Sequence, residues 1–237
     1  MTSLVLSLIP VALGIVMSPL AVIAVVAVLF SQHARANSVA YLAGWVAGIV
    51  VATGGAYAVL AALHVTDRID PPLWLSILHL VLAAELLIGA WYVYARGRKR
   101  LHAMAAAHKP GQIADAAPQL PKMLQSVEHF TAARSMLLGF ALFVFNPIDV
   151  SCAIVAALTL RLSGTSSSVQ LGVAVVFVVI AASSVAGPVG LLVVMPDRAE
   201  APLRALRQWI ATNTKLLNAG LLVLIAVMQL NKGIQGL

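Results

Sequence analysis

Six long apolar stretches dominate this chain, and they leave a lipid bilayer as the solvent in which it can fold. They cover approximately residues 4–30, 38–63, 73–95, 135–160, 169–195 and 216–234. Each is close to or longer than the ~20 residues that a helix needs to cross a bilayer. Backbone polar groups in lipid must be satisfied within their own segment, so we expect six transmembrane helices in an all-α integral membrane protein.

The composition leaves no room for a separate soluble domain. The 237 residues are 61% hydrophobic and only 10% charged, and their mean hydropathy is +0.98. A soluble domain carries about 25% charged residues. Residues 1–30 contain no Lys or Arg, whereas a cleaved signal peptide starts with a basic segment and has a shorter apolar core. We therefore expect the first stretch to be retained as a helix.

Two short proline motifs interrupt the first and fourth stretches. Ser18-Pro19 and Asn146-Pro147 are 128 residues apart, and the same offset relates Gly44 to Gly172. Each half thus resembles a unit of three helices whose first helix is broken. Because three is odd, the second unit must enter the membrane from the opposite side, which predicts two inverted repeats with a site near the breaks.

These repeats set the expected domain organisation. Residues 1–95 form the first three-helix repeat, residues 96–134 form a basic cytoplasmic linker, and residues 135–237 form the second repeat. The simpler interpretation is that the linker only joins the two repeats and fixes the orientation of the protein in the membrane. A sharper one is that the basic cluster at 96–100 attracts anionic lipid headgroups, and that residues 120–136 form an amphipathic helix on the membrane surface.

The basic residues also predict an orientation. If the linker is cytoplasmic, twelve of the fifteen Lys and Arg residues lie on that side: Arg35, Arg96, Arg98, Lys99, Arg100, Lys109, Lys122, Arg134, Arg198, Arg204, Arg207 and Lys215. The other side holds Arg68, Arg161 and Lys232. The positive-inside rule then predicts a multi-pass protein of the bacterial inner membrane with both termini outside the cytoplasm. The positive charge is thus explained by membrane orientation, and we expect no nucleic-acid partner.

Two acidic residues fall inside the apolar stretches, Glu85 and Asp149. An ionisable group at the centre of a membrane helix costs at least ~2.5–3.5 kcal/mol, so it usually faces a cavity or a partner. No Lys or Arg lies deep in the stretches, so one or both carboxyls could carry a proton, which would suit proton coupling. The alternative is that each is hydrogen-bonded to a Ser, a Thr or a freed backbone group.

The two proline motifs complete the candidate substrate- or ion-binding site. Proline removes a backbone donor and frees the carbonyl four residues earlier. Ser18 and Asn146 are placed to satisfy such groups, and freed groups that line a cavity can bind a substrate or an ion. The candidate residues are Ser18, Pro19, Glu85, Asn146, Pro147 and Asp149. The alternative for the prolines is a plain kink that aids packing.

The sequence favours neither a metal site nor an enzyme. His79 lies six residues before Glu85, about 600° around a helix, so the two point to different faces. We expect His79 to be a buried, hydrogen-bonded residue. No H-x-x-x-H pair and no nucleotide-binding loop is present, and we predict no cofactor. The lone Cys152 predicts a packing role and excludes an internal disulfide.

Small residues predict how the helices pack. Gly44 and Gly48 are four apart, which lets two helices approach closely, and such stripes make a homodimer plausible. Gly187-Pro188 predicts a break in the fifth stretch. Aromatic residues near the ends of the stretches are expected to anchor them at the membrane interface; they are Trp74, Trp91, Tyr92 and Tyr94.

These features resemble the GAP family of actinobacterial membrane proteins, which addresses glycopeptidolipid and sulfolipid to the cell surface, within the lysine-exporter superfamily. The resemblance rests on residues 16–24, 33–37, 42–48 and 145–147, and it covers the layout of the whole chain. It implies a role in export of cell-envelope glycolipids, alongside larger lipid-export machinery. The family pattern places a Lys soon after Asn-Pro, whereas this chain has Ile148 and Asp149.

We therefore expect a small secondary transporter whose substrate is a glycolipid. Two alternatives remain open. The chain could export a small polar solute such as an amino acid or a cation, or it could be a non-transporting assembly factor of a lipid-export complex. A membrane enzyme is the least favoured class, because no cluster of His, Asp and Glu lies in the stretches.

Overall fold

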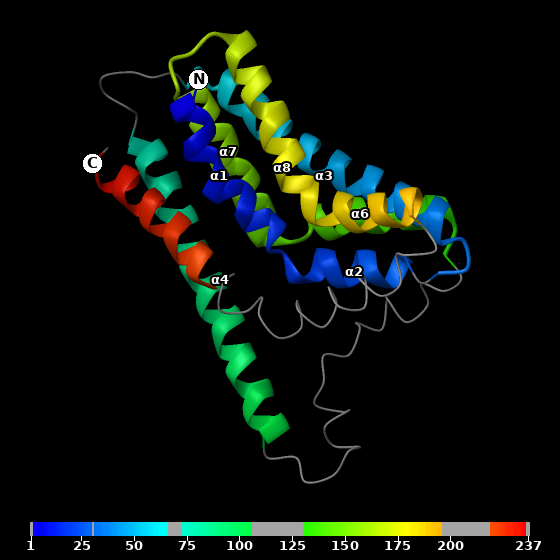
Figure 1. Cartoon of the computed structure of the whole chain (residues 1–237). Coiled ribbons are helices and arrows are strands. Elements are labelled where there is room, and N and C mark those ends of the chain that lie inside the picture. Colours follow the sequence, from blue (N-terminus) through cyan, green and yellow to red (C-terminus); the bar gives the residue numbers. More distant parts are fainter. Residues whose placement is uncertain (1, 30, 66–72, 106–129, 196–218, 236–237) are drawn as a thin grey trace.

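The computed structural model describes residues 2–29, 31–65, 73–105, 130–195 and 219–235, and these residues are helical with short connections (Figure 1). The helices are α1 (Thr2–Val16), α2 (Pro19–Leu29), α3 (Ala34–Ala62), α4 (Leu73–Ala105), α6 (Ala132–Val144), α7 (Pro147–Arg161), α8 (Ser167–Val194) and a C-terminal helix (Ala219–Gln235). No strand occurs in the ranges given, which confirms the all-α fold class. The domain boundaries around residues 96–134 stay a prediction, because residues 106–129 lie outside the described part.

Several of these helices are long and apolar enough to cross a membrane. They are α3, the segment Leu73–Tyr92 of α4, and α8, and the pair α6–α7 would make a fourth span that is bent by 70° at its break. The helix α1 and the C-terminal helix are apolar but shorter. The chain is thus a multi-pass membrane protein. The arrangement of six spans as two inverted triplets stays a prediction.

Both predicted helix breaks are confirmed. The first stretch divides into α1, which ends at Val16, and α2, which begins at Pro19. The fourth divides into α6, which ends at Val144, and α7, which begins at Pro147. Figure 1 shows the chain changing direction at each of these points. Proline is tolerated in the first turn of a helix because its missing N–H has no partner there, so each proline starts a helix.

The predicted break in the fifth stretch is wrong. The helix α8 runs from Ser167 to Val194 without interruption and contains Pro188. Figure 1 shows α8 changing direction sharply at one point, between its yellow and orange parts. A single proline removes one backbone hydrogen bond, and a helix can absorb this loss as a bend.

Close backbone contact joins α3 to α6, as the glycine spacing predicted. A Cβ atom added at Gly44 would lie 1.9 Å from the Met136 carbonyl oxygen, and one at Gly139 would lie 2.3 Å from the Tyr41 carbonyl oxygen. Only glycine fits at either position. Gly172 has nothing within 4 Å of such a Cβ. The offset of 128 residues therefore relates Gly44 and Gly172 in sequence but not in packing.

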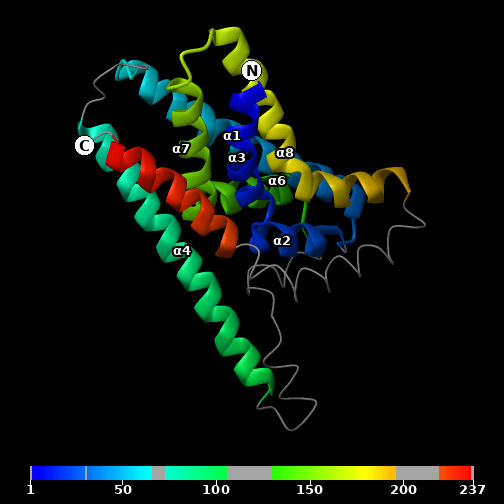
Figure 2. The same cartoon turned by 60° about the vertical axis from the view of Figure 1, so that its left-hand side comes forward.

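The helix α4 and the C-terminal helix lie side by side on one flank of the molecule (Figure 2). His79 Nδ1 is 2.7 Å from Gln229 Oε1, and both side chains are buried. The prediction that His79 is a buried, hydrogen-bonded residue is confirmed. The helix α4 continues to Ala105, past the predicted end of its apolar stretch at residue 95.

Three segments that the charge rule assigned to one side of the membrane meet at one end of the molecule. Arg35 Nη2 donates to the Val193 carbonyl oxygen at 3.1 Å, which joins the start of α3 to the end of α8. Asn37 Nδ2 donates to the Phe130 carbonyl oxygen at 2.8 Å, which brings the start of α6 to the same end. The side of the membrane on which this end lies stays a prediction.

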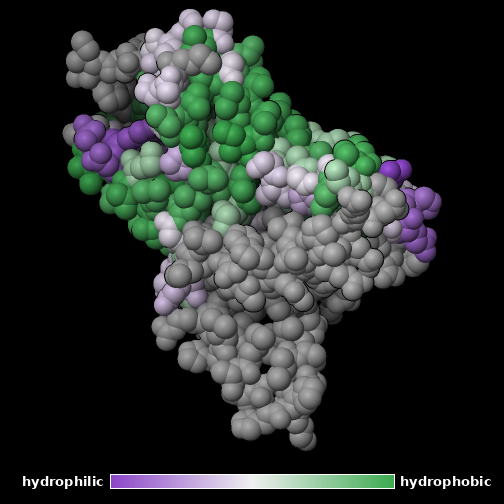
Figure 3. Space-filling view, viewed as in Figure 1, coloured by the Kyte–Doolittle hydropathy of each residue, from purple (hydrophilic) through white to green (hydrophobic). Residues whose placement is uncertain are grey.

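The surface between the ends is apolar. Figure 3 shows hydrophobic side chains covering the helices of the face in view, with hydrophilic residues at the margins. Large apolar side chains on α3, α4, α6 and α8 are exposed, as expected where a helix faces lipid. The four aromatic residues predicted as interface anchors are exposed as well: Trp74, Trp91, Tyr92 and Tyr94.

Candidate functional site

The two helix breaks meet in one hydrogen-bonded network. Ser18 Oγ donates to Asp149 Oδ2 at 3.0 Å. Asn146 Nδ2 donates to the same Asp149 oxygen at 2.6 Å and to Ser18 Oγ at 3.3 Å. Three of the six predicted site residues are thus in direct contact. We call Ser18, Asn146 and Asp149 the break network.

Local helix chemistry explains how these side chains are held. Asn146 is the N-cap of α7, and its Oδ1 accepts from the backbone N–H of Ile148 at 3.2 Å. Asp149 lies in the first turn of α7, where the partial positive charge of a helix N-terminus favours a carboxylate. Ser18 lies in the gap between α1 and α2, and its backbone N–H donates to the Ile15 carbonyl oxygen at 3.0 Å. Pro19 and Pro147 follow directly and begin α2 and α7.

Two members of the network are buried, Asn146 is partly exposed, and one buried oxygen lacks a hydrogen bond. Asp149 is 0% exposed and Ser18 is 3% exposed. Asp149 Oδ2 accepts both hydrogen bonds, whereas Asp149 Oδ1 is buried without a partner. Buried polar atoms are almost always hydrogen-bonded, and an exception calls for a physical explanation. A free oxygen at the junction of two broken helices can take a proton, a cation or a polar group of a substrate.

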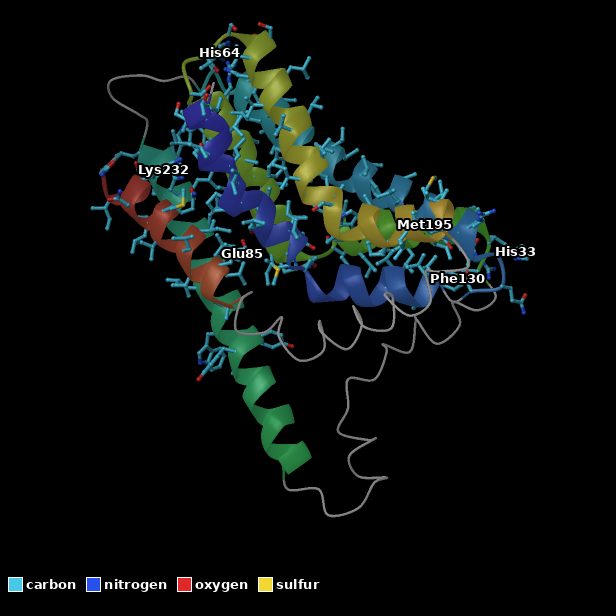
Figure 4. The ribbon with its side chains drawn as sticks, viewed as in Figure 1. His33, His64, Glu85, Phe130, Met195 and Lys232 are labelled. Carbon is cyan, nitrogen blue, oxygen red and sulfur yellow. The ribbon has the colours of Figure 1, made fainter. Side chains whose placement is uncertain are left out.

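Glu85, the remaining site candidate, binds the other side of α7. Its Oε2 accepts from Ser151 Oγ at 2.6 Å. Ser151 follows Asp149 by two residues, about 200° around the helix, so the two side chains leave α7 on opposite faces. Figure 4 shows Glu85 on α4, part-way along the helix. The structure therefore places Glu85 next to the break network without joining it. Sequence reasoning missed Ser151, which carries no signal beyond its position near the break.

Cys152 lies in the contact between α1 and α7, close to the break network. It is fully buried, and a Cβ atom added at Gly14 would lie 3.0 Å from its Sγ. The packing role predicted for Cys152 agrees with this position. Since Cys152 follows Asp149 by three residues, it lies one helical turn further along α7.

Apolar side chains of α1 and α8 pack against each other near the break. They are Val5, Leu8, Ile9, Ala12, Val173, Val176, Phe177 and Ile180, and the space between them has no room for a water molecule. Ala12 is six residues before Ser18, about 9 Å along a helix. The helix α1 thus makes an apolar contact with α8 and ends at the polar network. In the described part of the chain, no three His, Cys, Asp or Glu side chains are grouped so that they could hold a metal ion.

The comparison with family models decides the family. A model described as Sap, sulfolipid-1-addressing protein, matches residues 8–235. The chain belongs to the sulfolipid-1-addressing protein family. This match confirms the family indicated by the resemblance, and it includes every residue of the break network. No curated protein and no solved structure matches the chain. For this member of the sulfolipid-1-addressing family, the wider kinship with lysine exporters stays a prediction.

Proposed function

We propose that this chain is a secondary transporter that exports cell-envelope glycolipids, with the break network as its working site. The observation that carries the proposal is the buried Asp149, whose Oδ1 has no partner, at the point where two broken helices meet. Interrupted helices whose breaks adjoin are the places where transporters bind substrates and ions. Intramembrane carboxyls usually serve a pathway or a proton relay.

The proposed mechanism uses the hydrogen bonds of Asp149 as a latch between the two halves of the chain. The bond from Ser18 ties the first break to α7. When Asp149 takes up a proton, its carboxyl group gains an O–H donor and loses its negative charge. The hydrogen bonds that it accepts from Ser18 and Asn146 then become weaker. Glu85 is the second proton carrier in this scheme. The sequence has no nucleotide-binding loop, so uphill movement would draw on an ion gradient.

Two observations bear on the substrate. The family takes its name from a sulfolipid, so a glycolipid is the favoured substrate. The second candidate is a small polar solute, because the break network brings three polar side chains together, two of them buried. The chain would act without catalysis.

The charge pattern supports a setting in the bacterial inner membrane with both termini on the extracytoplasmic side. Larger lipid-export machinery is the partner that the family resemblance implies. A homodimer would have to use open small residues such as Gly54 and Gly55, because Gly44 and Gly48 pack against α6 within the chain. The rival role is a non-transporting assembly factor. In that case, deletion of residues 109–122 would impair lipid export more than Glu85→Gln does.

Export by an Asp149→Asn variant tests the proposal. The substitution keeps the size of the side chain and one acceptor oxygen, but the amide that replaces the carboxyl cannot exchange a proton. Cells that express the variant as their only copy should contain normal amounts of the protein in the membrane, while the surface fraction of their envelope glycolipid falls at least tenfold. Ser7→Ala, which removes a hydroxyl that bonds the Leu4 carbonyl oxygen within α1, is the matched control. Full export by the Asp149→Asn variant would overturn the proposal.

A further inference from the structure

Arg161 is a cation without an acidic partner in the described residues. It lies in the last turn of α7. The carboxyl side chains that the structure describes are Glu85 and Asp149, and both are engaged near the start of α7. Arg161 Nε is buried and has no hydrogen-bond partner. A buried donor of a charged group costs free energy unless an acceptor reaches it.

The surroundings of Arg161 hold its side chain in place. The guanidinium carbon lies 5.6 Å from the centre of the Tyr57 ring. Tyr57 Oη donates to Gln170 Oε1 at 2.5 Å, and Gln170 Nε2 donates to the Thr165 carbonyl oxygen at 2.8 Å. The Tyr57 ring is therefore fixed between α3 and the first turn of α8. Stacking on an aromatic face orients a guanidinium and leaves its N–H groups available at the edges.

Further donors lie at the same end of the molecule. Gln170 belongs to the N-terminal part of α8, whose N-cap Ser166 makes no side-chain cap. The first backbone N–H groups of α8, with the partial positive charge of the helix end, thus lie on the side of Tyr57. Figure 4 shows His64, which follows α3, at this end of the molecule. Among the described residues, no carboxyl side chain lies there.

The position along α7 matches the depth of a lipid headgroup. Arg161 is twelve residues after Asp149, about 18 Å along the helix axis. If Asp149 lies near the middle of the membrane, Arg161 is close to its surface. A guanidinium binds sulfate and phosphate through paired N–H groups.

We propose that Arg161, stacked on Tyr57, binds the anionic headgroup of a lipid, a sulfate or phosphate ester, at the end of α7 remote from the break network. This binding does not require that the chain transports anything. It can be measured with no gradient and no export, so the failure of either proposal leaves the other standing.

Lipid retention by the purified full chain tests the site. The probe is a set of phosphatidylcholine nanodiscs that contain either a sulfated galactosylceramide or the uncharged galactosylceramide, and mass spectrometry counts the lipid that stays with the protein. We expect the sulfated lipid to be retained at least tenfold better than the uncharged one. Arg161→Gln should abolish this preference.

Arg35→Gln is the matched control, because the Arg35 guanidinium is already engaged by the Val193 carbonyl oxygen at the other end of the molecule. It should keep the preference. Arg161→Lys retains the charge but not the planar pair of donors, and several-fold weaker retention is expected; it also serves if Arg161→Gln does not fold. An equal loss in the Arg35 and Arg161 variants would show diffuse charge attraction and overturn the proposal. Displacement of the lipid by inorganic sulfate at equal concentration would also overturn it, because a free anion would then suffice.

Discussion

Asn146 Nδ2 donates to Ser18 Oγ at 3.3 Å, so the residues that precede the two helix-starting prolines touch one another. Both also donate to the same oxygen of Asp149. The contact spans 128 residues of sequence. It makes the two breaks one site, and it concentrates the ionisable chemistry of that site on the second break, where Asp149 lies.

Removal of the Ser18 hydroxyl should loosen the junction. Ser18→Ala takes one of two donors from a buried carboxyl, and the loss of such a bond costs about 1–3 kcal/mol. Thermal unfolding of the purified protein should move to a lower temperature. Ser7→Ala, which loses a bond within α1 only, should change little. Identical unfolding of the two variants would contradict the role given to Ser18.

The two glycines related by the repeat offset should respond in opposite ways to alanine. Gly44→Ala places a methyl group 1.9 Å from the Met136 carbonyl oxygen, so α3 and α6 must separate. Overpacking of this kind costs about 1–3 kcal/mol or more, and the yield of monodisperse protein should fall sharply. Gly172→Ala meets nothing within 4 Å and should fold normally. Size-exclusion profiles of the variants compare them directly, and equal profiles would show that α3 and α6 are not in close contact.

The bond between His79 and Gln229 should hold the C-terminal helix to α4. His79→Leu leaves Gln229 Oε1 buried without a donor, and a cost of about 1–3 kcal/mol is expected. The double variant His79→Leu, Gln229→Leu removes both polar groups and should recover most of the loss. A double-mutant cycle on unfolding temperature measures the coupling. Additive losses would mean that the two side chains do not interact.

Substitution of Glu85 should change glycolipid export without changing the stability of the protein. Glu85→Gln keeps an oxygen that can accept from Ser151 Oγ but removes the exchangeable proton, so unfolding should be unchanged while glycolipid export falls. Ser151→Ala leaves export chemistry in place and should cost about 1 kcal/mol of stability. If Glu85→Gln exports normally, Glu85 is a structural hydrogen-bond acceptor, and the role of proton carrier is lost.

Local sequence rules predicted much of this fold because they depend on single residues. Proline at positions 19 and 147 breaks a membrane helix whatever surrounds it, and both breaks are confirmed. Gly44 predicted a close helix contact, although not that α6 would be the neighbour. The break predicted at Pro188 was wrong, because α8 absorbs the loss of one backbone hydrogen bond as a bend. Whether a proline breaks or bends a helix depends on neighbours that one sequence does not reveal.

Hydrogen-bond partners far apart in sequence were beyond such rules. Asp149 and Glu85 were identified by their cost in a membrane, but nothing local indicates that Ser18 or Ser151 would be their donors. The stacking of Arg161 on Tyr57 was equally hidden, because the two residues lie on different helices. The charge pattern predicted that Arg161 lies at a membrane surface, but it did not predict the contact with Tyr57.

The reactivity of Cys152 under an imposed proton gradient tests the central claim, that the break network closes the junction and opens through Asp149. Cys152 is the only cysteine, it is fully buried, and it lies one turn beyond Asp149 against Gly14. In membrane vesicles, a small maleimide should label it slowly at rest and at least tenfold faster when a gradient is applied, and Asp149→Asn should abolish the acceleration. Equal labelling with and without the gradient, or the same acceleration in the Asp149→Asn variant, would contradict the account.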